Sequence, residues 1–212
     1  TEYFKVVLAA LNMVYPELAK RTEHHAFGFV VLKTGKMSSH TGDVVAGMWL
    51  LDEAVSRIKK TFPEMDETTA EQVGIAAVKY SMLKSSRESD ITFSFEESIS
   101  LEGNSGPYIQ YSYVRTQSVL EKSEVRPSTS LRVKNPKSEI NSKLQIGNFK
   151  QDLNLEELAL LRLLSRFSEV VEEAGDKFAP HMVCQYLFVL AQAFNLFYQK
   201  HSILEAKEGE DI

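Results

Sequence analysis

The feature that most constrains how this chain can fold is a long stretch without a single charged residue, from Phe178 to Gln199. As a helix, such a stretch is long enough to cross a bilayer. Polar side chains nevertheless recur along it at helical spacing and form a stripe: His181, Gln185, Gln192, Asn195 and Gln199. This stripe predicts a long amphipathic or buried helix of a folded domain, opened by Pro180, and argues against a membrane span.

The rest of the chain predicts a mainly α fold with two short extended segments. Apolar residues recur with helical periodicity in most segments, and short β-rich runs occur twice. The expected helices cover Tyr3–Met13, Gly47–Thr61, Thr68–Leu83, Pro107–Lys122, a run from Asn154 through Phe167 towards Gly175, and Pro180–His201. The expected extended segments are Ala26–Leu32 and Ile91–Phe95, the expected loops are Lys33–Asp43 and Val125–Gln151, and Glu205–Ile212 is a charged tail.

Composition indicates an ordinary water-soluble protein of one large or two small domains. The net charge is −5, which by itself disfavours nucleic-acid binding. Charge is uneven, however: residues 61–104 are acidic and residues 126–150 are basic. The basic stretch could bind phosphates or simply be solvated.

The single cysteine, Cys184, excludes an internal disulfide and fits a reducing compartment. No cysteine–histidine cluster suggests a metal, and the start shows neither a signal peptide nor an initiator Met, as in a fragment or a processed product.

The loop after the first extended segment reads Gly35-Lys36-Met37-Ser38-Ser39. An ammonium group and two hydroxyls on a mobile loop can close over a polyphosphate and stabilise the charge that develops on a pyrophosphate leaving group. Four-residue matches of this kind also arise by chance, and the alternative is a solvated surface loop.

The helix that begins at Pro107 carries a second candidate site. Tyr108, Tyr111 and Arg115 have the spacing i, i+3 and i+7 and therefore share one face. Two exposed aromatic rings beside an arginine can stack unpaired bases. The alternative is that the tyrosines pack in the core and that Arg115 is a solvated charge. Another face of this helix is expected to be core: Ile109, Tyr113, Thr116 and Leu120.

Several segments, in order along the chain, resemble class I arginyl-tRNA synthetases. The run from His25 to Ala54 is similar to the family's His-x-Phe-Gly strand, signature loop and Leu-Leu-Asp-Glu-Ala helix. Further similar segments are Gln72–Tyr80, Asp90–Phe95, Glu102–Tyr111 with Arg115, and the last helix with Pro180-His181, Tyr186-Leu187 and Phe194 to Tyr198.

The resemblance implies three parts: the end of a Rossmann-like catalytic domain (1–46), a helical connecting region that contacts the tRNA stem (47–104), and an α-helical bundle that binds the anticodon (105–212). It implies ATP with Mg²⁺ as substrate, tRNA(Arg) and L-arginine as partners, and a cytoplasmic ligase. The implied ATP residues are Phe27, Gly28, Lys36 and Met37, and Lys36, Ser38 and Ser39 are the implied catalytic residues. Tyr108, Tyr111, Arg115 and Tyr198 are implied at the anticodon, although Tyr198 could equally be a buried tyrosine.

The chain departs from the family's pattern at the signature loop and in what precedes it. Ser39 stands where the wider class has a second lysine, and His40 stands where relatives carry a basic residue. No His-Ile-Gly-His motif is found, so arginine would be bound by an N-terminal half outside this chain. We therefore expect the chain to be inactive alone, and a non-catalytic tRNA- or RNA-binding module remains the alternative.

Overall fold

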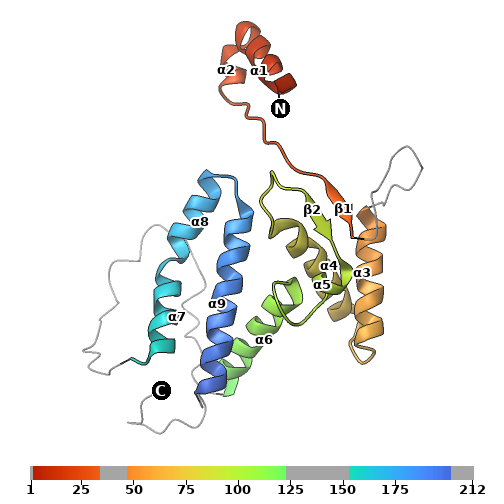
Figure 1. Ribbon diagram of the computed structural model, residues 1–212, viewed down its shortest axis with the longest axis vertical. Coiled ribbons are helices and arrows are strands. Elements are labelled where there is room, and N and C mark those ends of the chain that lie inside the picture. The colour runs from red at the N-terminus through yellow and green to blue at the C-terminus, as the bar shows by residue number, and fades with distance from the viewer. Residues whose placement is uncertain (1, 34–46, 123–152, 202–212) are drawn as a thin grey trace.

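The computed structural model describes residues 2–33, 47–122 and 153–201. Helices dominate these ranges, as the sequence predicts (Figure 1). The elements are α1 (Glu2–Val14), α2 (Pro16–Ala19), β1 (Val30–Leu32), α3 (Gly47–Thr61), α4 (Glu67–Leu83), β2 (Ile91–Phe93), α5 (Phe95–Ser98), α6 (Gly106–Lys122), α7 (Leu155–Ser165), α8 (Phe167–Asp176) and α9 (Pro180–Lys200). The predicted loop Lys33–Asp43 lies outside the described residues except for Lys33, and the predicted loop Val125–Gln151 and tail Glu205–Ile212 lie outside them entirely. Within the described ranges, no helix combines the length and apolar character that a membrane crossing requires.

The two strands are parallel and form a small sheet in which Val30 pairs with Ile91 and Leu32 with Phe93. The first strand is shorter than the predicted Ala26–Leu32, because the N–H groups of Gly28 and Phe29 donate to residues before β2, and the Gly28 N–H donates to the Arg87 carbonyl at 2.7 Å. The Phe29 N–H donates to the Asp90 carboxylate at 2.8 Å instead of to a backbone carbonyl. The second strand ends at Phe93, since the Ser94 side chain caps α5.

The main core lies between the sheet and the helices α3 and α4. Its buried residues are Leu50, Ala54, Val78, Phe93 and Phe95, with Val30, Leu32, Leu51 and Met82 packed around them. Gly74 allows α4 to approach α3 closely: a Cβ there would lie 2.7 Å from a side-chain carbon of Val55. The predicted helical bounds of Gly47–Thr61 are confirmed.

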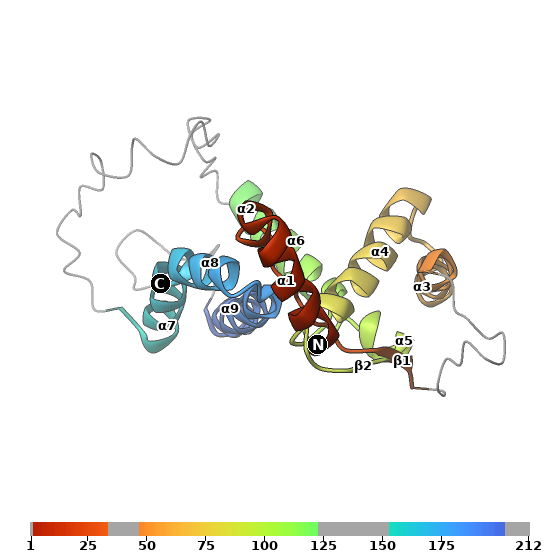
Figure 2. The same ribbon diagram turned by 90° about the horizontal axis from the view of Figure 1, so that it is seen from above.

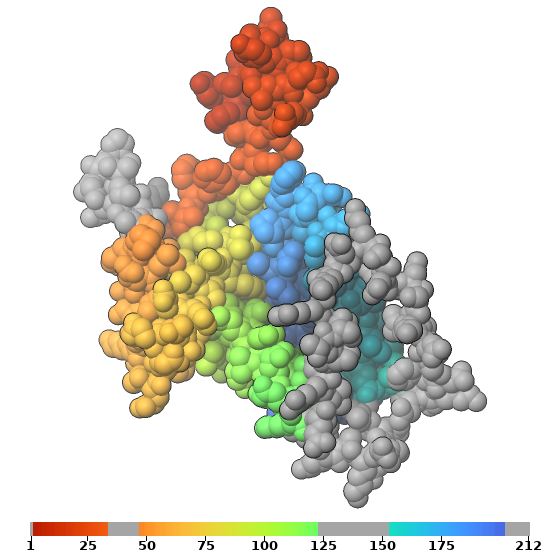
Figure 3. Space-filling view, turned by 180° about the vertical axis from the view of Figure 1, so that it is seen from behind, coloured from red at the N-terminus to blue at the C-terminus, as the bar shows by residue number. Residues whose placement is uncertain are grey.

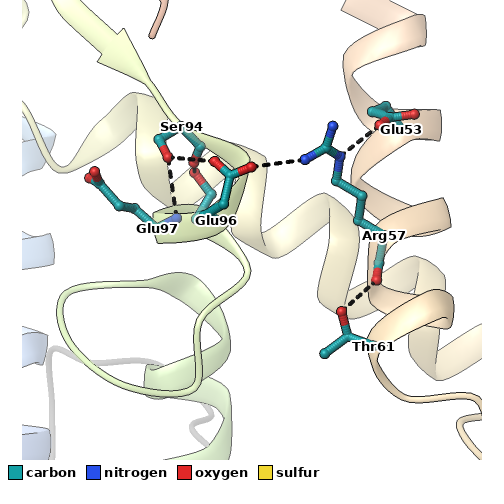
Figure 4. A network of polar contacts seen from close by, with 7 residues as sticks. Glu53, Arg57, Thr61, Ser94, Glu96 and Glu97 are labelled. Carbon is teal, nitrogen blue, oxygen red and sulfur yellow. Dashed lines mark hydrogen bonds and ion pairs between the residues drawn. The ribbon is translucent and has the colours of Figure 1, made fainter. Parts of the chain in front are cut away.

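A polar network ties α3 to α5 (Figure 4). The Arg57 Nε donates to Glu53 at 2.6 Å, and its Nη1 donates to Glu96 at 3.1 Å. The Ser94 hydroxyl donates to the other oxygen of Glu96 at 3.0 Å. The guanidinium also lies 4.4 Å from the centroid of the Phe95 ring. This network fixes the end of the sheet against α3.

The second group of helices is built around α9. The predicted uncharged stretch forms this helix, and α4, α6, α7 and α8 all contact it. The Tyr186 hydroxyl donates to the Leu163 carbonyl of α7 at 3.0 Å, and the Tyr80 hydroxyl of α4 donates to the Cys184 carbonyl at 3.0 Å. The helix predicted to run from Asn154 past Phe167 is interrupted at Arg166, so that α7 and α8 pack along α9 as separate helices.

The N-terminal helices α1 and α2 stand off the body of the molecule as a small lobe (Figures 1 and 3). In the view from above they are drawn in front of α6 (Figure 2). Neither helix has a buried residue. Large apolar side chains of the lobe are exposed, among them Tyr3, Val6, Met13 and Tyr15. α2 packs against α1, and the His24 ring stacks on Phe4 with the ring centroids 4.0 Å apart, but these contacts leave the large apolar side chains exposed.

Candidate nucleic-acid interface

Helices α6 and α9 bring together four of the predicted site residues. Tyr108, Tyr111 and Arg115 come from α6, and Tyr198 comes from α9. Arg115 lies at the centre. Its guanidinium carbon is 4.6 Å from the centroid of the Tyr111 ring and 4.7 Å from that of Tyr198. The arrangement is a cation flanked by two aromatic rings, which attract it through their negative faces.

Arg115 is held by neutral partners. Its Nη1 donates to the Asn195 side-chain oxygen at 2.8 Å, and its Nη2 donates to the Tyr111 hydroxyl. No carboxylate pairs with it within residues 2–33, 47–122 and 153–201. The positive charge is therefore available to an anion, although the side chain itself is partly buried.

Asn195 organises this surface, although the sequence placed it only in the polar stripe of the last helix and not among the predicted site residues. It is buried, with 8% of its surface exposed. Its amide nitrogen donates to the Tyr108 hydroxyl at 3.0 Å and to the Ser112 hydroxyl at 2.9 Å, while its oxygen accepts from Arg115. The available signal was its position in the polar stripe of an otherwise apolar helix, where a buried amide must find partners.

Two tyrosines of α6 lie differently from the prediction. Tyr108, expected to be exposed, is half-buried and packs edge-on against Phe188 at 5.7 Å between centroids. Tyr113, expected in the core, is 63% exposed. The reason is that α4 and α9 cover α6 on the side that carries Tyr108 and Ser112, and Tyr113 projects from another side. Of the α6 tyrosines at the interface, Tyr111 is the exposed one, at 44%.

The contact between α4 and α9 buries two further titratable side chains, Tyr80 and Cys184. Burial raises the pKa of Cys184, which stays a neutral thiol, and the same effect raises the pKa of Tyr80 well above its usual range. The single proton of the Tyr80 hydroxyl is shared between the Cys184 carbonyl and the side-chain oxygen of Asn104, which lies 2.6 Å from the hydroxyl oxygen. Among the described residues there is no cluster of side chains that could hold a metal ion.

The residues predicted at the ATP site are only partly described. Lys36, Met37, Ser38 and Ser39 lie outside the described residues. Phe27 is 85% exposed, on the segment that leads to them. Gly28 has a packing reason to be glycine: an added Cβ would lie 2.2 Å from the Ser89 carbonyl oxygen. The segment 87–91 therefore fixes the backbone that precedes the loop.

Comparison with known families and proteins identifies two matching regions. Residues 1–95 match the family of "tRNA synthetases class I (R), catalytic domain", and residues 109–211 match the "DALR anticodon binding domain". The chain is 35% identical over 214 aligned residues to an arginine–tRNA ligase of Clostridium botulinum (strain Loch Maree / Type A3), covering 98% of this chain and 35% of that protein. A Clostridium kluyveri arginine–tRNA ligase is 34% identical over 212 residues, covering 97% and 35%.

Solved structures agree with these matches. The structure of Thermus thermophilus arginyl-tRNA synthetase has a TM-score of 0.69 to this chain at 30% identity, covering 97% of this chain and 31% of that one. The Plasmodium falciparum enzyme has a TM-score of 0.56 at 24% identity, covering 82% and 28%, which supports the fold. The chain thus spans 35% of the length of the Clostridium relatives. It belongs to the class I arginyl-tRNA synthetase family, and it corresponds to the C-terminal part of that family's members.

Proposed function

We propose that this chain binds the anticodon region of tRNA(Arg) through the surface formed by Tyr111, Arg115 and Tyr198, as part of an arginine–tRNA ligase. The observation that carries the proposal is the guanidinium of Arg115, which lies between two tyrosine rings without a carboxylate partner in the described part of the chain. An unpaired base can stack on the exposed ring of Tyr111, and the arginine can meet a phosphate or a base edge. Tyr108 and Asn195 would act from behind, by holding these groups in place.

We propose a separate role for each of three consecutive parts of the chain. Residues 1–46 would supply the end of the catalytic domain, residues 47–104 a connection that contacts the tRNA stem, and residues 105–212 the anticodon-binding domain. Lys36, Ser38 and Ser39 would steady the pyrophosphate of ATP with Mg²⁺, beside Phe27, Gly28 and Met37. L-arginine would be bound by catalytic residues outside this chain. A cytoplasmic location would follow from a role in translation.

The test is binding of a tRNA(Arg) transcript by variants of α6. Tyr111→Ala should weaken binding by about 1–3 kcal/mol, the usual effect of losing one stacked base. Tyr113→Ala is the matched control, because Tyr113 lies on the same helix, is more exposed, and is not one of the two rings that flank Arg115. Filter binding at one fixed salt concentration measures both.

An unchanged affinity in Tyr111→Ala would mean that tRNA(Arg) does not bind at this surface. An equal loss in Tyr113→Ala would mean that the substitutions act by disturbing α6 as a whole.

A further inference from the structure

The corner between α8 and α9 has a backbone conformation that does not suit its residue. Phe178 has a φ of 49°, in the left-handed region that glycine favours. Two hydrogen bonds form the usual helix-ending motif around it: its own N–H donates to the Gly175 carbonyl at 3.1 Å, and the Ala179 N–H donates to the Ala174 carbonyl at 2.8 Å. Glycine or asparagine normally occupies this position. A bulky residue held here points to a role for its side chain.

The Phe178 ring contacts a residue distant in sequence. Its centroid lies 4.2 Å from that of the His25 ring, with 44° between the ring planes. His25 is held from another direction by Arg87, whose Nη1 contacts the His25 Nδ1. The contact therefore joins the α8–α9 corner to the segment between α2 and β1.

That segment leads directly to the signature loop. Three residues after His25, the Gly28 N–H donates to the Arg87 carbonyl at 2.7 Å. β1 follows, and the Lys33 N–H then donates to the Phe93 carbonyl at 3.0 Å. Arg87 thus contacts both the His25 ring and the backbone of Gly28. Phe178, from the α8–α9 corner, contacts the same His25 ring.

Helix α9 connects this point with the anticodon-binding surface. It runs without interruption from Pro180, two residues after Phe178, past Asn195 and Tyr198. At 1.5 Å per residue, Pro180 and Tyr198 are about 27 Å apart along it. In Figure 1 one end of α9 lies towards the strands and the other towards the far end of α6. A rigid helix therefore has the His25 contact at one end and the Arg115 surface near the other.

We propose that Phe178 is a positioning residue. Through its contact with His25 it holds the segment before the signature loop in position, and α9 couples the position of this segment to tRNA bound at Arg115. The coupling rests on the proposed function, whereas the positioning stands on the His25 contact alone. The strained conformation of Phe178 is then the consequence of placing an aromatic ring, and not a smaller residue, at this corner.

The first experiment measures amide hydrogen exchange in the 212-residue chain. Phe178→Gly removes the ring and relieves the backbone, so the unfolding midpoint should be equal or higher. Exchange at residues 28–33 should nevertheless accelerate, by roughly 10-fold. His25→Ala should accelerate this exchange at least as much, because it also removes the contact with Arg87. The double variant should exchange no faster than His25→Ala, because both substitutions remove the contact between Phe178 and His25. Phe178→Trp should retain the original rates.

Unchanged exchange in Phe178→Gly would overturn the proposal, as would accelerations that multiply in the double variant. Loss of cooperative unfolding in Phe178→Gly would contradict it too, because the ring would then be needed for the cap.

The second experiment repeats the exchange with a saturating tRNA(Arg) transcript. Bound tRNA should slow exchange at residues 28–33 in the wild-type chain and not in Phe178→Gly, while the affinity of the two for tRNA stays within about 2-fold. Equal slowing in both would overturn the coupling. If the wild-type chain does not bind the transcript, the proposed function and the coupling fail together, and the first experiment still decides the positioning role.

Discussion

Arg115 shows how a single residue can combine charge, shape and stacking. Its planar guanidinium donates in fixed directions to Asn195 and Tyr111 while lying against two rings. A lysine carries the same charge without the planar fork or the stacking surface. The two side chains can therefore separate the contribution of charge from that of geometry.

Arg115→Lys should weaken tRNA binding by roughly 10-fold and leave its salt dependence unchanged, since the charge remains. Arg115→Ala should weaken it further and reduce the slope of log affinity against log salt by about 0.7, the value for one contact to a single-stranded phosphate. Filter binding at several salt concentrations measures both slopes. Identical slopes in the wild type and Arg115→Ala would show that Arg115 contacts no phosphate.

At the scale of elements, local signals determined the ends of several helices. The Asn154 side chain accepts from the Glu157 N–H at 2.9 Å, and the Glu157 carboxylate accepts from the Asn154 N–H at 2.9 Å, so that the two residues form a capping box at the start of α7. Asn154→Ala should lower the free energy of unfolding by about 1 kcal/mol. Asn154→Ser, which keeps a capping oxygen, should lose less. Urea unfolding followed by circular dichroism measures both, and equal losses would mean that the cap is not what stabilises this end.

Features that depend on tertiary contacts could not be predicted from local sequence signals. The break at Arg166 arises where α7 and α8 both follow α9, and a periodic run of leucines does not show it. Tyr113 had the spacing of a core residue and is exposed, because burial on α6 depends on which neighbours cover it. Asn195 was visible as a polar residue, but its link to Arg115 joins residues 80 positions apart.

At the scale of the whole molecule, the fold class and the family could be predicted because matching segments occur in order over nearly the entire chain. The described structure also agrees with a catalytic domain of which only a part is present. A two-stranded parallel sheet is small, and α1 exposes apolar side chains that no described residue covers. Such a surface in a folded protein commonly marks a place where further protein packs.

This incompleteness leads to a prediction about catalysis. The sequence contains the Gly35–Ser39 loop and no His-Ile-Gly-His motif. The groups proposed for the pyrophosphate are therefore in this chain, and those expected to bind the reacting adenylate and arginine are not. The pure 212-residue chain should therefore show no ATP–pyrophosphate exchange with arginine, with or without tRNA(Arg). The same chain joined to the remaining two-thirds of a related ligase should show exchange, and Lys36→Ala in that protein should reduce its rate by at least about 10-fold, because the charge that stabilises the leaving group is lost. ATP–pyrophosphate exchange by the isolated chain would contradict the proposal that part of the active site lies outside this chain. Full activity of the joined Lys36→Ala protein would show that Lys36 does not take part in catalysis.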